Sequence, residues 1–224
     1  MERAAVITGG TGALGQAVVE CLLDRGVACH VTWKFESELA EFAHADAVKL
    51  HEVDCADETA VAEFYAGLDR VDASVHVVGG FAMAPIDATS RADFVSLFEL
   101  NAVTAFLCCR EAVRKMRSHG GGQIVNVAAR PAVQPTGGMI AYTTAKAAVA
   151  SITQCLADEV KDDGICVNAI LPSVLDTPAN RSAMPSADFE CWPKVTEVAR
   201  AIAFLASPES RLTSGALVPV YGRA

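Results

Sequence analysis

A glycine-rich turn near the start of the chain limits its fold more strongly than any other feature. An apolar run at residues 4–7 is followed at once by TGGTGALG, residues 8–15, and then by an amphipathic stretch. Gly10-x-Gly12-x-x-Gly15 has the spacing of a dinucleotide-binding turn, whose glycines let backbone N–H groups approach a pyrophosphate. A strand before it and a helix after it are the context such a turn needs. We expect the phosphates at the N-terminus of a helix that begins near Ala13.

Short apolar runs alternate with helical patterns from one end of the chain to the other. The expected strands are residues 4–7, 27–33, 47–53, 73–78, 123–128, 165–171 and 216–220. The expected helices are residues 13–25, 37–43, 58–68, 91–118, 142–161 and 196–206. Continuous apolar strands that alternate with helices predict a parallel sheet covered on both faces. We expect one doubly wound α/β Rossmann domain over residues 1–224, with about seven strands and with ligands at the carboxyl ends of the strands.

The end of the second expected strand bears on the choice of cofactor. A chain that uses NAD usually has Asp or Glu there, which binds the ribose 2′-OH. This chain has Trp33 and Lys34 instead. Lys34 would attract a 2′-phosphate and Trp33 would lie against the adenine, so NADPH is the expected cofactor and NADH the alternative. Glu36 and Glu38 follow closely and weaken this argument, and a solvated lysine at a strand end is the competing interpretation.

Tyr142 and Lys146 form the most informative catalytic pair. Their spacing places a phenol and an ammonium on one face of a helix. A nearby ammonium favours the phenolate, so we expect Lys146 to lower the pKa of Tyr142 from about 10. Tyr142 would then exchange a proton with a C=O or C=N group during hydride transfer. A chance pair on a surface helix is the alternative, and the glycine turn argues against it.

Composition excludes several other classes of function. With 224 residues and 52% hydrophobic content, the chain can bury one full α/β core. Its net charge of -9 argues against nucleic acid, whose phosphates need a basic surface. Its eight cysteines and five histidines lack ligand spacing, so we expect no metal site. We expect no secretory leader, no membrane span and a reduced, cytoplasmic protein.

Residues 172–193 form the one long irregular stretch, and loops of this length are usually lids or binding loops. Met184, Phe189 and Trp192 within it would either close over a flat substrate or pack onto the core.

The chain resembles the short-chain dehydrogenase/reductase family over nearly its whole length. The resemblance is carried by residues 8–15, 77–80 and 172–177, together with Asn101, Tyr142 and Lys146. The resemblance implies that Tyr142 and Lys146 are catalytic, that Asn101 supports the lysine, and that Asp54 contacts the adenine. It also implies binding of the nicotinamide half of the cofactor by the segment from Pro172 to Thr177. The candidate cofactor-binding residues are Gly9, Gly10, Thr11, Gly12, Ala13, Leu14, Trp33, Lys34, Asp54, Cys55, Val78, Gly79, Gly80, Tyr142, Lys146, Pro172, Val174 and Thr177.

Ala129, thirteen residues before Tyr142, departs from the family pattern. The family usually has a serine there, whose hydroxyl steadies the substrate oxygen. Losing one such donor costs about 10²–10³ in rate. Either the substrate is easy to reduce, or a donor such as Arg130 or Thr136 replaces the serine, or the chain is not a reductase.

One branch of the family, similar to dihydropteridine reductase, resembles this chain in lacking the serine. The segments that resemble it are residues 12–15, 78–81, 136–142, 175–181 and 184–189, with Trp192 just after. That resemblance implies reduction of an activated C=N or C=O acceptor. The branch prefers NADH and has an acidic residue where this chain has Trp33, which is a difference.

Three functions therefore remain open on the sequence alone. They are reduction of an activated acceptor, reduction of a ketone or aldehyde in small-molecule metabolism, and cofactor binding without redox chemistry. The family resemblance also implies a homodimer or homotetramer, with the helices at 91–118 and 142–161 at the interface.

Overall fold

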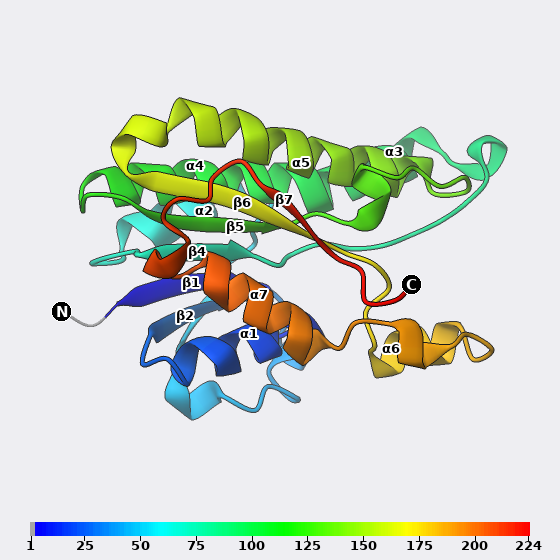
Figure 1. The fold of residues 1–224 in the computed structure, drawn as a ribbon, viewed down its shortest axis with the longest axis horizontal. Coiled ribbons are helices and arrows are strands. Elements are labelled where there is room, and N and C mark those ends of the chain that lie inside the picture. Colours follow the sequence, from blue (N-terminus) through cyan, green and yellow to red (C-terminus); the bar gives the residue numbers. More distant parts are fainter. Residues whose placement is uncertain (1–2) are drawn as a thin grey trace.

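Seven apolar segments pair into one parallel sheet in the computed structural model, which describes residues 3–224 (Figure 1). The strands are β1 Ala4–Thr8, β2 Ala28–Trp33, β3 Lys49–Glu52, β4 Ala73–His76, β5 Gly122–Val127, β6 Ile165–Pro172 and β7 Leu217–Val220. Their order in the sheet is β3-β2-β1-β4-β5-β6-β7, and every pairing is parallel. The order reverses direction between β1 and β4, which is where ligands bind in such sheets. The predicted doubly wound α/β fold is confirmed.

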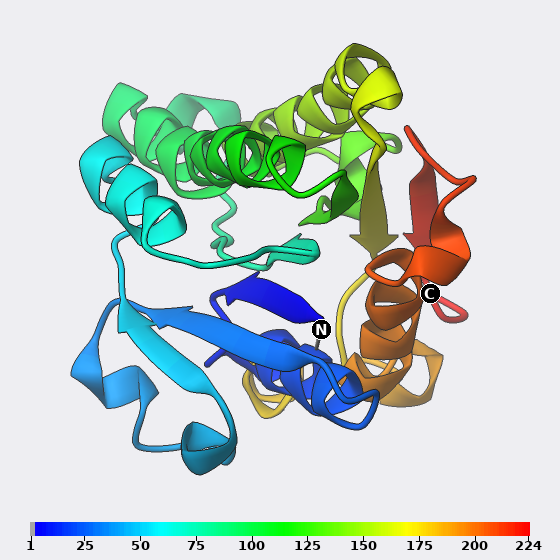
Figure 2. The ribbon, with the colours of Figure 1, turned by 90° about the vertical axis from the view of Figure 1, so that its left-hand side faces the viewer.

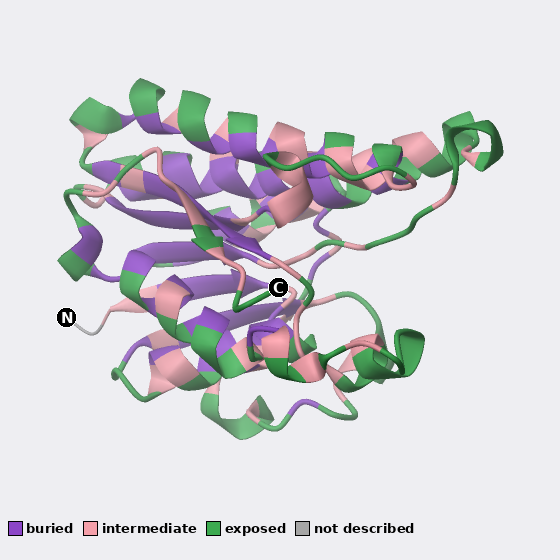
Figure 3. Ribbon diagram, turned by 45° about the vertical axis from the view of Figure 1, so that its right-hand side comes forward, coloured by how far each residue is buried: buried purple, intermediate pink, exposed green. Residues whose placement is uncertain are grey.

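Helices cover both faces of this sheet (Figure 2). α1 Ala13–Leu23 packs against α7 Val195–Leu205 on one face. α2 Glu58–Ala66, α4 Thr104–Arg117 and α5 Ile140–Glu159 cover the other, and α3 Arg91–Phe98 packs against α5. Two apolar layers result, and the central strands between them are buried along almost their whole length (Figure 3). Burial on both faces explains why these strands read as continuous apolar runs.

α3 and α4 form one helical run joined by a π-helical turn at Glu99–Val103. The sequence predicted a single helix over residues 91–118, and the turn is the only irregularity. By length and composition alone, the run Arg91–Arg117 is apolar enough to cross a membrane, a test that the core helices of soluble proteins also pass. In this fold it packs against α2 and α5 instead.

Two expectations about elements are wrong. Residues 37–43 were predicted to be helical, but the structure has a 3₁₀ turn at Glu36–Glu38 followed by hydrogen-bonded turns. Contacts with the glycine turn hold this segment, and helices this short are marginal by themselves. Residues 172–193 are also not wholly irregular, because they contain α6 Pro178–Ala183 and a 3₁₀ turn at Phe189–Cys191.

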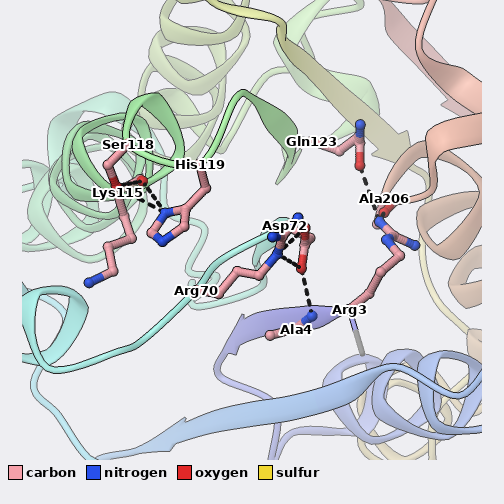
Figure 4. Close-up of polar contacts among 9 residues, drawn as sticks. All are labelled: Arg3, Ala4, Arg70, Asp72, Lys115, Ser118, His119, Gln123 and Ala206. Carbon is pink, nitrogen blue, oxygen red and sulfur yellow. Dashed lines mark hydrogen bonds and ion pairs between the residues drawn. The ribbon is translucent and has the colours of Figure 1, made fainter. Parts of the chain in front are cut away.

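The amino-terminal end of the sheet is fixed by charged side chains (Figure 4). Asp72, just before β4, accepts hydrogen bonds from the Ala4 N–H at 2.9 Å and from Arg70 Nε at 2.8 Å. Arg3 Nη2 donates to the Ala206 carbonyl at 2.9 Å, which ties β1 to the end of α7. These contacts lie at the end of the sheet opposite to the end where the strands finish.

Candidate functional site

The carboxyl ends of the strands carry the residues that the sequence suggested for a site. In Figure 1 they lie at the end of the sheet where α6 and the segment between β4 and α3 project. In strand order along the chain, this end carries the turn Gly9–Leu14, Trp33 and Lys34, Asp54 and Cys55, Val78 to Gly80, Ala129, and Pro172, Val174 and Thr177. The π-helical turn and α5 bring Asn101, Tyr142 and Lys146 to the same end.

The turn between β1 and α1 fits a dinucleotide pyrophosphate. Gly12 is the N-cap of α1 and no side chain caps this helix end, so its first N–H groups face outward. A Cβ on Gly15 would collide with the Gly9 carbonyl, so only glycine lets the helix pack this closely. A Cβ on Gly12 would meet nothing closer than the Gly9 oxygen at 3.6 Å, which leaves space beside the turn. The Thr8 hydroxyl, at the end of β1, is buried without a hydrogen-bond partner in the described structure.

Lys34 does not stand free at the end of β2. Its Nζ lies 2.7 Å from Asp54 Oδ2, and both side chains are partly exposed. Burial alone would raise the pKa of Asp54, but hydrogen bonds from Lys34 and the Ala56 N–H outweigh it and hold that pKa below its ordinary value. Cys55 is buried, with its Sγ 3.7 Å from Thr32 Oγ1.

The side chain of Glu38 reaches the glycine turn, a contact that the sequence did not predict. Its Oε2 accepts a hydrogen bond from Thr11 Oγ1 at 2.8 Å. The sequence places Glu38 four residues after Lys34 but gives no sign that the carboxylate folds back onto the glycine turn.

The π-helical turn places Asn101 against the segment that follows β4. Asn101 Nδ2 donates to the carbonyls of Gly80 at 3.0 Å and Leu97 at 2.9 Å, and its Oδ1 accepts from the Gly80 N–H at 3.2 Å. A Cβ on Gly79 would lie 2.6 Å from Asn101 Oδ1 and 3.1 Å from Lys146 Nζ. Gly79 therefore separates Asn101 from Lys146 with no room for a side chain. Such local π turns are frequent at functional sites.

Tyr142 and Lys146 lie one turn apart at the start of α5. Lys146 Nζ donates to the Val127 carbonyl at 2.8 Å and lies 6.0 Å from the centre of the Tyr142 ring. Burial lowers the pKa of Lys146 to about 8 and raises the pKa of Tyr142 to about 12. The expectation that Lys146 lowers the pKa of Tyr142 is wrong for this structure, because burial dominates and the ammonium group is directed to Val127. Tyr142 is therefore a protonated phenol at neutral pH.

Ala129 is buried just after β5, and one of the two suggested substitutes for its missing hydroxyl, Arg130, is bound elsewhere. Arg130 Nη1 donates to the Ala224 carbonyl at 2.6 Å, its Nε donates to Gln134 Oε1 at 2.8 Å, and its guanidinium lies over Tyr221. Thr136 is exposed and lines a pocket with Ile86 and with Thr143, the residue that follows Tyr142. The structure thus directs Arg130 to the C-terminal segment and keeps Thr136 at the surface.

Phe81, which the sequence analysis included only as the last residue of the segment 78–81, lies next to Tyr142. Its ring lies edge-on to Tyr142, with centres 4.9 Å apart and an angle of 83° between the planes. Phe81 is 59% exposed, so one exposed apolar side chain borders Tyr142. Its place directly after Gly80 was the available signal.

Residues 172–193, which we call the lid, are organised by their own contacts. Thr177 caps α6 by accepting from the Asn180 N–H at 3.2 Å, and Asp176 holds Arg181 at 2.6 and 2.9 Å. The Asp176 N–H donates to the Pro193 carbonyl at 3.0 Å, which closes the base of the lid.

Phe189 and Trp192 pack inside this lid. Phe189 lies beneath the Arg181 guanidinium and against Trp192, which is buried. Of the three residues considered for closing over a substrate, Met184 is the one that remains 37% exposed.

Comparison with known proteins gives the same result for fold and family. Residues 3–188 match the model of the short chain dehydrogenase family. A cis-4-hydroxycyclohexanecarboxylate dehydrogenase from Sinomonas cyclohexanicum is 32% identical, with 99% of this chain and 96% of that protein covered. A short-chain type dehydrogenase/reductase from Picea abies is 27% identical over 98% of this chain and 91% of its own. The solved structure of acetoin dehydrogenase from Enterobacter cloacae superposes with a TM-score of 0.87 at 27% identity, covering 99% and 95% of the two chains.

Proposed function

The chain belongs to the short-chain dehydrogenase family, and from that premise we propose that this NAD(P)-dependent oxidoreductase reduces an activated C=N or C=O acceptor. Activated here means electron-poor, as in a quinonoid dihydropterin, so that hydride addition needs little help from a hydrogen-bond donor. A dihydropteridine reductase-like activity is the specific form of the proposal. The observation that supports it is Ala129, a buried residue without a hydroxyl at the position where the family usually has a serine.

The cofactor would be held along the carboxyl ends of the strands. The turn Gly9–Leu14 would bind the pyrophosphate, with Asp54, Cys55 and the end of β2 around the adenosine. Val78, Gly79 and Gly80, with Pro172, Val174 and Thr177, would border the nicotinamide half. When bound, the reduced nicotinamide supplies the hydride.

Tyr142 would supply the proton. Its pKa, raised by burial to about 12, keeps a proton on the phenol at neutral pH, as reduction requires. The substrate carbon receives the hydride while the substrate nitrogen or oxygen takes the proton from Tyr142 Oη. Lys146 would hold the cofactor ribose and return a proton to the phenolate, and Asn101 would fix the backbone at Gly80 beside it.

A second candidate is reduction of an ordinary ketone or the reverse oxidation of an alcohol. The names of the relatives favour it, since cis-4-hydroxycyclohexanecarboxylate dehydrogenase is named for an alcohol substrate. Under this alternative the buried Ala129 would be a catalytic handicap. Under the first it would be nearly neutral.

Replacing Ala129 by serine distinguishes the two candidates. We expect Ala129→Ser to change kcat/KM by less than about threefold for quinonoid dihydropterin and to raise it by about 10–10² for a plain cyclic ketone. The measurement is nicotinamide absorbance with each acceptor, with Ala128→Ser on the same strand end as control. A large gain with the quinonoid acceptor would refute the first candidate.

We also propose a homodimer or homotetramer in the cytoplasm. All eight cysteines are free, which suits a reducing compartment. An apolar groove of about 230 Å³ on the α3–α5 face supports self-association, lined by Phe98, Ala102, Val103, Phe106 and Ile152.

A further inference from the structure

The carboxylate of Glu38 is fixed against the glycine turn. Its Oε2 accepts from the Thr11 hydroxyl at 2.8 Å, and the Lys34 N–H lies 3.5 Å from the same oxygen. Thr11 is buried and Glu38 is half-buried. Glu36, two residues before Glu38 in the same 3₁₀ turn, is exposed. Glu38 is therefore held beside the turn, unlike its neighbour Glu36.

A second tether holds the same loop on the turn. The Ala43 N–H donates to Gln16 Oε1 at 3.3 Å, and Gln16 Nε2 donates to the Thr11 carbonyl at 3.0 Å. Thr11 is thus held from both its hydroxyl and its carbonyl. The loop after β2 is docked beside the place where the turn would receive a dinucleotide, so Glu38 is pre-positioned.

The local charge is unfavourable for an additional phosphate. Lys34 is the cation that would attract a 2′-phosphate, but its ammonium group already lies 2.7 Å from Asp54. Hydrogen bonds from Lys34 and the Ala56 N–H keep the pKa of Asp54 low, so this carboxylate is ionised at neutral pH. Lys34, Asp54 and Glu38 together sum to one negative charge. A 2′-phosphate would add to it, whereas a ribose hydroxyl would donate to a carboxylate.

We propose that Glu38 is the residue that selects the cofactor, accepting the ribose hydroxyl of NADH and repelling the 2′-phosphate of NADPH. This inference rests on the proposed nicotinamide-dependent function. It replaces the expectation from the sequence, in which a free Lys34 favoured NADPH. In other dinucleotide-binding folds, a carboxylate at the end of β2 accepts the hydrogen bond from the ribose 2′-OH. Here Glu38 would take that role from the 3₁₀ turn after β2.

Binding measurements test this inference without turnover. Titration of tryptophan fluorescence with each cofactor at 0.15 M salt should give a Kd for NADH at least tenfold below that for NADPH. Glu38→Gln should reduce this ratio at least tenfold, by weakening NADH and strengthening NADPH. Glu36→Gln is the matched control and should leave the ratio unchanged. Asp54→Asn should strengthen NADPH by releasing Lys34.

Competition with half-molecules provides a second measurement. Adenosine 5′-monophosphate should displace NADH better than 2′,5′-ADP from the wild-type protein, and Glu38→Gln should remove the difference. NADPH binding as tight as NADH binding in the wild type would overturn the inference and leave the reductase proposal standing. An unchanged ratio in a folded Glu38→Gln protein would overturn it too. If neither cofactor binds, the proposed function itself fails.

Discussion

At Gly79, a single hydrogen atom in place of a side chain keeps Asn101 and Lys146 in place. We expect Gly79→Ala to lower kcat/KM about 10²-fold, because the new methyl group would push one of these polar groups away and shifts of about 1 Å have effects of this size. Circular dichroism should show an unchanged fold. Steady-state kinetics with NADH and a quinonoid acceptor provide the measurement.

Gly137→Ala is the matched control, because a Cβ there meets no atom within 4 Å. It should retain activity within about twofold of the wild type, as surface substitutions away from special features have small effects. Equal losses in the two variants would mean that the spacing between Asn101 and Lys146 does not matter for turnover.

Residue types could be assigned from the sequence more securely than their partners. The glycine turn, Asn101, Tyr142 and Lys146 were all expected at the site, and the structure brings them to one end of the sheet. The pairing of Lys34 with Asp54 and of Glu38 with Thr11 could not be read from spacing, because both depend on where a loop folds back. The raised pKa of Tyr142 likewise depends on burial, which the i, i+4 spacing does not reveal.

At the scale of elements, the pairing of β2 with β3 includes two histidines that should make stability sensitive to acid. His30 Nδ1 and His51 Nε2 lie 3.0 Å apart and their rings stack. Burial, then His51 and Lys49, lowers the pKa of His30 to about 4, and burial lowers that of His51 too. The unfolded chain takes up these protons near pH 6.5 and the folded chain only at lower pH. The stabilisation is therefore complete above about pH 6.5 and is lost as the pH falls towards 4.

Replacing His30 should remove part of this dependence. Between pH 6.5 and 4, both proteins should lose unfolding free energy. We expect the loss in His30→Gln to be smaller than the loss in the wild type by about 1–3 kcal/mol. Urea unfolding at a series of pH values measures it. His76, buried with a pKa of about 4, contributes in the same range and should keep a residual slope. A slope identical to the wild type would contradict the account of the histidine pair.

The elements that were predicted wrongly from the sequence are segments whose conformation depends on contacts made by loops. The segment 37–43 has the apolar spacing of a helix, but Glu38 and Ala43 are bound to the glycine turn and to Gln16. α6 was missed although Thr177 and Pro178 form a common helix start, a cap followed by proline at the first position. The strands were predicted well because burial on both faces leaves a continuous apolar signal.

At the scale of the whole molecule, the α3–α5 face is where a second copy should bind. Phe106 lines the groove there and is 47% exposed. We expect light scattering to show a dimer or tetramer for the wild type and a monomer for Phe106→Glu, because a charge buried in an apolar interface is costly. Phe204→Glu, on α7 and 44% exposed, is the control and should keep the wild-type mass. A monomeric wild type would refute the assembly.

The central claim is that hydride reaches an activated acceptor while Tyr142 donates the proton. The most direct measurement is oxidation of NADH and NADPH by chemically generated quinonoid dihydropterin, compared between the wild type and Tyr142→Phe. The wild type should turn over rapidly. The variant should bind the cofactor equally well and lose about 10²–10⁴ in kcat. Turnover in the variant at the wild-type rate, or a wild type that binds the cofactor but reduces no activated acceptor, would contradict the account.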